Sequence, residues 1–309
     1  MPASRYRPET RLVQAGTLRS EFGETSEALF LTQGYVYESS AQAERRFKNE
    51  EPGYQYSRFA NPTVAMFEAR MAAFEGAEAA RATATGMAAV TVALLGQVKA
   101  GDHVVAAKAL FGSCRYVVED FLPRYGVTST LVDGTDLKQW KQAVRPNTKT
   151  FFLESPTNPT LEIIDIAEVA KIAHAAGATL VVDNVFATPL FQSPLALGAD
   201  CVVYSATKHI DGQGRCLGGV ILASEKFIQD NVQNLIRRDA TRGKDENEQR
   251  HHHDATADTE QPGGKADQRA DSQVGEPLHQ RSRCATSSAK PAPKAACVTY
   301  LGSAVMRPA

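Results

Sequence analysis

The sequence predicts an α/β fold in which a mostly parallel sheet lies between helices. Short apolar runs of five or six residues, rich in Val, Leu and Ile, recur along the chain, and helical stretches separate them. The runs are continuously apolar instead of alternating between apolar and polar residues. Strands of this kind, joined through helices, are typical of a parallel sheet that is covered on both faces. The 309 residues suffice for one large or two ordinary domains.

Residues 1–60 carry few periodic apolar positions and many aromatic and charged ones. This pattern predicts an extended N-terminal arm that packs on another part of the protein. A helix is expected to begin after Asn61, because Pro62 suits the first turn of a helix, and to end at Gly76. Its apolar residues recur at helical spacing, at Val64, Phe67, Met71 and Phe74. A second helix is expected over 86–95.

The alternation of strands and helices continues to about residue 237. The expected strands lie at 103–107, 127–132, 150–154, 179–183, 201–205 and 218–223. The helices expected between them lie at about 112–123, 135–142 and 165–176. We therefore predict one large domain over 61–237.

The composition changes at residue 238. Residues 238–309 contain six large aliphatic side chains and no Ile, Phe or Trp. Such a segment cannot bury enough apolar surface to offset the conformational entropy that ordering removes. We predict a disordered tail over 238–309. The adjacent histidines at 251–253 are not expected to bind a metal, because a flexible chain does not fix a tetrahedral site.

Composition and charge also exclude several classes of protein. The net charge is −1 and the first 237 residues contain no basic stripe, so we expect no nucleic-acid partner. No apolar run reaches about 18 residues, which excludes a membrane span, and the N-terminus lacks the apolar stretch of a secretory signal. The five cysteines are scattered without CxxC spacing, which predicts reduced thiols in the cytoplasm.

Polar residues follow three of the predicted strands at the point where each strand ends. Ligands of open α/β sheets bind outside the carboxyl ends of the strands. One edge of the sheet should therefore collect Asn158, Asp183, Ser205, Thr207 and Lys208.

The side chains at this edge allow two interpretations. Lys208 is either a surface lysine with its ammonium in water, or a desolvated amine whose lowered pKa lets it form a Schiff base with a carbonyl. Asp183 either turns the chain or pairs with a protonated heterocyclic nitrogen. Gly86 and Met87 either begin a helix or, with the hydroxyls, donate to a phosphate dianion. The second interpretations together specify pyridoxal phosphate.

Five motifs carry a resemblance to a known family. They are YSRFANPT (56–63), ATATGMAAV (82–90), ESPTNPT (154–160), VVDNVFATP (181–189) and YSATKHIDGQGRCLGG (204–219). In this order they resemble the Cys/Met-metabolism family of pyridoxal-phosphate enzymes over roughly residues 8–237. The resemblance implies the large domain of the type I fold of PLP-dependent transferases.

The resemblance also implies a role for each matching residue. Lys208 would bond to the cofactor aldehyde and act as the catalytic residue. Asp183 would face the pyridine nitrogen, and Asn158 would donate to the phenolic oxygen. The phosphate would be held by Gly86, Met87, Ser205 and Thr207. Tyr56 and Arg58 of the arm would reach the phosphate in a neighbouring subunit, which implies a homodimer or homotetramer.

One position departs from the pattern of many family members, which place a tyrosine on the cofactor ring. Phe111 stands there in this sequence. A phenyl ring still stacks, but it has no hydroxyl to transfer a proton, and this favours the members that act as sulfhydrylases over the lyases. The implied reaction is gamma-replacement on O-succinylhomoserine with sulfide, giving homocysteine in methionine biosynthesis. Cysteine or another thiol in place of sulfide, an acetyl ester and gamma-lyase chemistry are the alternatives.

The family resemblance ends near residue 237. Members of the family have a C-terminal small domain that supplies the arginine for the substrate carboxylate, and residues 238–309 do not resemble it. The Arg-, Ala- and Gly-rich composition of this segment indicates coding sequence read out of frame, so we hypothesise a truncation or frameshift near residue 237. A cofactor-binding fragment without activity is therefore a third interpretation. Translation of the gene in its other two frames tests the hypothesis.

Overall fold

The computed structural model of the chain describes residues 7–237. The described residues all belong to one compact unit. The tail predicted over 238–309 and its histidines lie outside the described residues. The boundary predicted between residues 60 and 61 stays a prediction.

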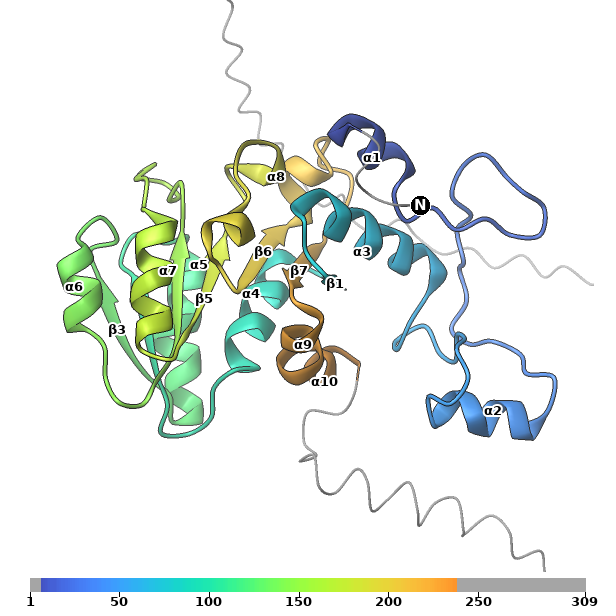
Figure 1. Cartoon of the computed structure of the whole chain (residues 1–309), viewed down its shortest axis with the longest axis horizontal. Coiled ribbons are helices and arrows are strands. Elements are labelled where there is room, and N and C mark those ends of the chain that lie inside the picture. Colours follow the sequence, from blue (N-terminus) through green and yellow to red (C-terminus); the bar gives the residue numbers. More distant parts are fainter. Residues whose placement is uncertain (1–6, 238–309) are drawn as a thin grey trace, which may run out of the picture. The chain divides into compact units, whose positions relative to one another are not determined.

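A seven-stranded sheet forms the centre of the described part of the chain (Figure 1). The strands are β1 (Ala79–Thr83), β2 (His103–Ala107), β3 (Thr128–Val132), β4 (Thr148–Glu154), β5 (Thr179–Asp183), β6 (Cys201–Ser205) and β7 (Gly219–Ala223). Their order across the sheet is β1-β7-β6-β5-β4-β2-β3. The neighbours from β6 to β3 pair in parallel. All six predicted strands are present, and the predicted mostly parallel sheet is confirmed.

Two features of the sheet were not predicted. β1 has the sequence AARAT, which lacks the apolar β-branched residues that indicate a strand. It forms because its whole length pairs with β7. β7 runs antiparallel to both β1 and β6. The connection over 206–218 contains one short helical turn, Ala206–Ile210, and no helix long enough to cross a face of the sheet, so the chain turns back beside β6.

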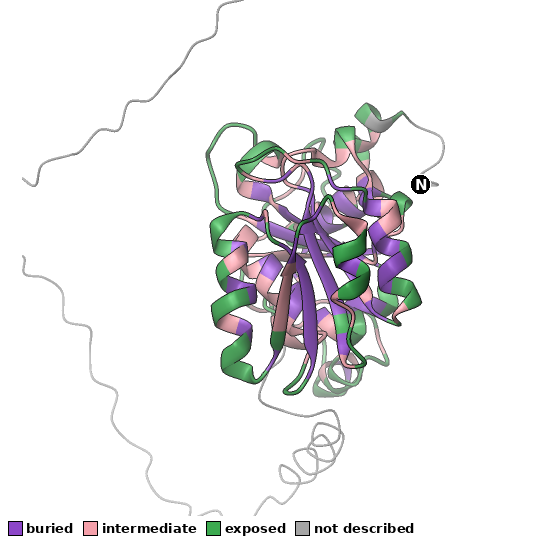
Figure 2. Cartoon of the chain, turned by 90° about the vertical axis from the view of Figure 1, so that its left-hand side faces the viewer, coloured by how far each residue is buried: buried purple, intermediate pink, exposed green. Residues whose placement is uncertain are grey.

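Helices cover both faces of the sheet, as expected. They are α3 (Pro62–Glu75), α4 (Gly86–Leu95), α5 (Gly112–Tyr116), α6 (Leu137–Gln142), α7 (Ile166–Ala175), α8 (Thr188–Phe191), α9 (Glu225–Phe227) and α10 (Gln233–Arg237). Shorter helical turns continue α5 to Tyr125 and join α9 to α10. Figure 2 shows buried strands between helices whose outer sides are exposed. Asn61 caps α3 through the N–H of Thr63, and Gly76 ends it at φ 82°.

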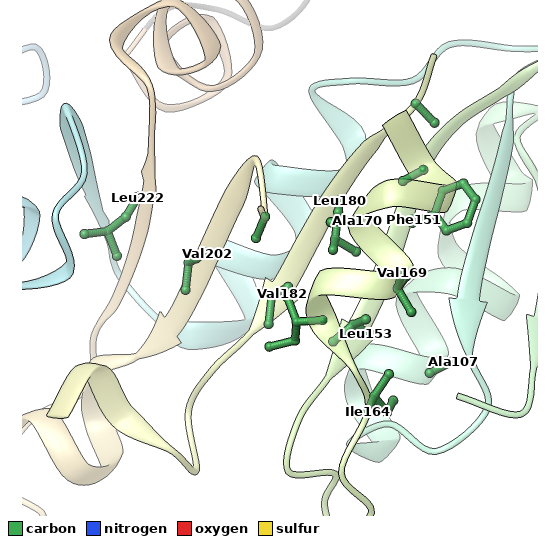
Figure 3. Close-up of a cluster of buried hydrophobic side chains, with 14 of the residues drawn as sticks. Ala107, Phe151, Leu153, Ile164, Val169, Ala170, Leu180, Val182, Val202 and Leu222 are labelled. Carbon is green, nitrogen blue, oxygen red and sulfur yellow. The ribbon is translucent and has the colours of Figure 1, made fainter. Parts of the chain in front are cut away.

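Successive strand residues pack into two separate cores, because their side chains point to opposite faces. Phe151 and Leu153 of β4 pack with α7 on one face, in the cluster drawn in Figure 3. Phe152 of the same strand packs with α4 and α5 on the other face. This two-sided burial explains why the strands are continuously apolar and fixes their carboxyl ends at one edge.

The N-terminal arm is partly helical, which corrects the prediction of an extended segment. It contains α1 (Pro8–Gln14) and α2 (Ser40–Phe47). Both helices are short and polar, so their sequences show no clear apolar spacing. The arm packs on α3, as expected of a segment that needs a partner. The Asn61 side chain donates to the carbonyl of Phe30, and the Phe30 N–H donates to Thr63, both at 2.9 Å.

None of the helices within residues 7–237 is long and apolar enough to cross a membrane.

A buried polar network ties α3 to the loop after β5. The Tyr204 hydroxyl of β6 donates to Glu75 at 2.5 Å and accepts from the Asn184 amide at 2.7 Å. The Gln192 amide donates to Asn184 at 2.7 Å and to the carbonyl of Ser155 at 2.8 Å. Burial raises the pKa of Glu75 to about 7, because the ionised carboxylate would lose its hydration.

We predict that Glu75→Gln makes the stability of the fold less sensitive to pH. The folded-state pKa of Glu75 lies above its unfolded value, so the unfolded chain releases this proton first as the pH rises. The stability that protonated Glu75 contributes is complete below about pH 4.5 and is lost as the pH rises through about 7. The loss of unfolding free energy between pH 5 and pH 8 should be about 2–3 kcal/mol smaller in the variant.

Urea unfolding at both pH values measures this difference. The exposed Glu21→Gln variant is the control and should behave as the wild type. An equal pH dependence in Glu75→Gln and in the wild type would contradict the assignment.

Candidate active site

A cavity of about 560 Å³ opens at the carboxyl ends of the central strands. This volume falls in the range of small-molecule sites. Eight of the ten candidate residues line the cavity, namely Gly86, Met87, Phe111, Asn158, Asp183, Ser205, Thr207 and Lys208. Tyr56 and Arg58 are not among its lining residues. The sheet-edge rule therefore predicted the place of the cavity correctly.

One end of the cavity has the donors of an anion site. The N-terminus of α4 lies against the end of β6 so closely that a Cβ on Gly86 would stand 2.5 Å from the Ser205 Cβ. Thr85 caps the helix through the N–H of Ala88. The first N–H groups of a helix have no acceptor within it and favour negative charge. The Thr207 hydroxyl, in contrast, donates its proton to the Gly218 carbonyl at 3.2 Å and accepts from the Gly218 N–H at 3.0 Å, so in this structure it is not free to donate to an anion.

Asp183 ends β5 inside the cavity and is 6 % exposed. One carboxylate oxygen accepts from the Val185 N–H at 3.1 Å, and the other lies 3.8 Å from the Cys114 sulfur. Burial raises the pKa of Asp183 to about 6. Burial and the Asp183 charge also raise the pKa of the Cys114 thiol, which therefore stays protonated and donates. A cation opposite Asp183 would compensate the ionised carboxylate for the hydration that it loses on burial. The site therefore favours a ligand with a protonated nitrogen at this position.

Lys208 lies in the short helical turn that follows β6, and its backbone has non-helical angles of φ −91° and ψ −114°. Its side chain lines the cavity together with Asp183. Lys208 is exposed, so residues 7–237 match the first of its two interpretations, a lysine in contact with solvent. Any exclusion of water must come from a bound ligand or from residues outside the described part of the chain.

Glu154 and Cys114 line the cavity and were not among the predicted site residues. Glu154 ends β4, opposite Asp183 in the register of the sheet, and is 3 % exposed. Burial, and next the charge of Asp183, raise the pKa of Glu154 to about 7. A polar residue closing an apolar strand, as Glu154 does in TFFLE, was the available signal.

Tyr56 and Arg58 lie in the arm, where Tyr56 is 43 % exposed. The Arg58 guanidinium stacks on the ring of Phe59 at 4.6 Å and approaches that of Tyr56 at 5.7 Å. The role implied for these two residues in a neighbouring subunit stays a prediction. Within residues 7–237 there is no cluster of three or more His, Cys, Asp or Glu that would hold a metal ion.

Comparison with known proteins agrees with the geometry of the cavity. Residues 9–266 match the family model of Cys/Met metabolism PLP-dependent enzymes. The match extends past residue 237, where the motifs had placed its end.

Known relatives and solved structures agree with the family match. An O-succinylhomoserine sulfhydrylase of Mycobacterium tuberculosis is 55 % identical over 73 % of this chain and 55 % of its own length. An L-methionine gamma-lyase of Fusobacterium nucleatum is 40 % identical over 78 % of this chain and 61 % of its own. A Campylobacter jejuni structure containing N'-pyridoxyl-lysine-5'-monophosphate has a TM-score of 0.70 and 29 % identity, covering 74 % of this chain and 57 % of the other. The chain thus spans about half the length of the curated relatives it matches.

We predict that Gly86→Ala damages the anion end of the cavity. The new Cβ must displace Ser205, which should lower the unfolding free energy by about 1–3 kcal/mol, as overpacking does, and weaken the binding of pyridoxal phosphate about tenfold or more. Denaturant unfolding and fluorescence titration with the cofactor measure the two effects.

Gly112→Ala is the matched control, because Gly112 also begins a helix and its added Cβ meets no described atom within 4 Å. This variant should bind and unfold as the wild type. Equal behaviour of the two variants would show that the approach of Gly86 to Ser205 is not tight.

Proposed function

Because the chain belongs to the family of Cys/Met metabolism PLP-dependent enzymes, we propose that its cavity binds pyridoxal phosphate and that the protein is a sulfhydrylase. The proposed reaction is gamma-replacement on O-succinylhomoserine, with sulfide entering and succinate leaving, to give homocysteine. The observation that carries the proposal is the meeting of Asp183, Lys208 and the α4 anion site in one cavity.

The residues of the cavity fit the cofactor chemically. The close approach of Gly86 to Ser205 leaves room for no side chain at the anion end, and the donors there suit a phosphate dianion. At the other end the buried Asp183 carboxyl has no salt-bridge partner within residues 7–237, and a protonated ring nitrogen would supply one. The apolar ring of Phe111 suits stacking on an aromatic ligand. The side-chain amide of Asn158 suits hydrogen bonding to a phenolic oxygen.

When bound, pyridoxal phosphate supplies an electron-poor ring that stabilises negative charge on the adjacent substrate carbon. Asp183 keeps the ring nitrogen protonated. Lys208 would hold the cofactor through its amine, and its free amine would take the proton from the alpha carbon of the substrate and return protons along the same face. Phe111 would hold the ring by stacking but has no hydroxyl to exchange a proton. Lys208 would therefore transfer the protons without help from a phenol at position 111.

The identity of residue 111 also bears on the choice between sulfhydrylase and lyase. The absence of a phenolic hydroxyl at Phe111 supports a sulfhydrylase, as does the 55 % identity to one, against 40 % for a gamma-lyase. Cystathionine gamma-synthase chemistry, with cysteine as acceptor, is the second candidate.

We further propose that the protein works in the cytoplasm as a homodimer or homotetramer. Cys114, Cys201 and Cys216 are free thiols among the described residues, which supports a location in the reducing cytoplasm. The oligomer rests on the arm, whose Tyr56 and Arg58 line no part of their own cavity and would complete the phosphate site of a second subunit.

The experiment is a visible absorption spectrum of the full chain with pyridoxal phosphate, followed by addition of O-succinylhomoserine and sulfide. We expect a protein-bound cofactor band that Lys208→Ala abolishes, and formation of homocysteine. Lys149→Ala, at the opposite end of β4, is the control and should keep the band.

Each other outcome has a distinct meaning. Product formed with cysteine but not with sulfide would favour the synthase, and release of the gamma-substituent with water alone would favour a lyase. A band without turnover would identify a cofactor-binding chain that is inactive by itself. No band in the wild type would contradict the proposal.

A further inference from the structure

The carboxylate of Glu154 contacts two loops that belong to different strands. Its Oε2 accepts the N–H of Phe111, in the loop after β2, at 2.8 Å. The Glu154 carboxyl group also accepts the backbone N–H of Asn158, in the loop after its own strand β4. Phe111 and Asn158 each place a side chain in the cavity. One buried carboxylate therefore joins the backbones of the two residues proposed to flank the cofactor ring.

The position of Glu154 in the sheet explains why this contact affects the cavity. β2 and β4 are neighbours, yet β3 comes between them in the chain and lies beyond β2 at the edge. The loops after β2 and β4 thus lead away from each other at the point where the strand order reverses, where ligands of such sheets bind. A bond between the two loops fixes the width of the opening.

The chemistry of the contact favours a carboxylate over other acceptors. Two N–H groups donate to one side chain that is 3 % exposed, and a carboxyl group offers two oxygens as acceptors. A glutamine at this position has one acceptor oxygen, and its amide nitrogen would face an N–H group without accepting it.

We propose that Glu154 is a positioning residue of the cofactor site. Its carboxyl group holds Phe111 and Asn158 at the separation that lets both side chains contact the cofactor ring. The inference rests on the proposed cofactor, and it assigns to Glu154 no contact with the reacting atoms. Asp183, Cys114 and Lys208 are the titratable groups that share the cavity with it, together with His209.

The first test needs no cofactor. Hydrogen exchange of the full chain, followed by mass spectrometry on peptides containing Phe111 or Asn158, compares the wild type with Glu154→Gln. We expect at least one of these two amides to exchange about tenfold faster or more in the variant, since it loses its acceptor. Unchanged exchange at both would overturn the proposal.

The second test adds pyridoxal phosphate. We expect Glu154→Gln to bind it about tenfold more weakly, with a smaller visible circular dichroism signal per bound cofactor, because the ring is held less firmly. Faster exchange in the variant with wild-type affinity and circular dichroism would also overturn the proposal. If the wild type binds no cofactor, the proposed function fails, while the exchange experiment still decides whether Glu154 holds the two loops.

Glu68→Gln separates a positioning role from a general loss of stability. Glu68 is likewise a buried glutamate that accepts a backbone N–H, that of Ala82 at 2.8 Å, but it does not line the cavity. This control should alter exchange near Ala82 and leave cofactor affinity and circular dichroism unchanged. Equal losses of cofactor affinity in both variants would assign Glu154 a structural role instead.

Discussion

The parallel register of the central strands is the constraint on which the site depends. Glu154 pairs with Asp183 across β4 and β5, and Asp183 pairs with Val203 of β6. This alignment ends β4 and β5 at one level and carries β6 two residues further, so that two carboxyl groups line the same cavity as Ser205, Thr207 and Lys208. The apolar cores on both faces hold the register, because a slip of one residue would exchange the two faces of a strand.

Sequence reasoning succeeded where residue type and position are tied by a physical rule. Continuous apolar runs indicate buried strands, and the end of such a run gives the sheet edge, so the placement of Asp183 and Lys208 followed. It failed where tertiary contacts decide. β1 has no strand pattern of its own and forms against β7, while the direction of β7 depends on how its connection turns. The hydrogen bond from Phe111 to Glu154 joins residues 43 positions apart in the chain, and no local sequence pattern predicts it.

The exposure of Lys208 and the positions of Tyr56 and Arg58 have a common explanation. The cavity is formed by one end of a single sheet, and the described residues leave that end open to solvent on the side of Lys208. The matched part of the chain covers 55 % of the length of the Mycobacterium tuberculosis sulfhydrylase. Residues 7–237 therefore bring the side chains of the site together but leave Lys208 exposed.

The proposed function depends on Lys208 carrying pyridoxal phosphate opposite Asp183. Borohydride reduction of the cofactor-treated chain, followed by digestion and mass spectrometry, tests it most directly, since reduction makes the bond to the lysine permanent. We expect a stoichiometric phosphopyridoxyl mass on the peptide that contains Lys208. Labelling spread over surface lysines, with Lys208 unmodified, would contradict it.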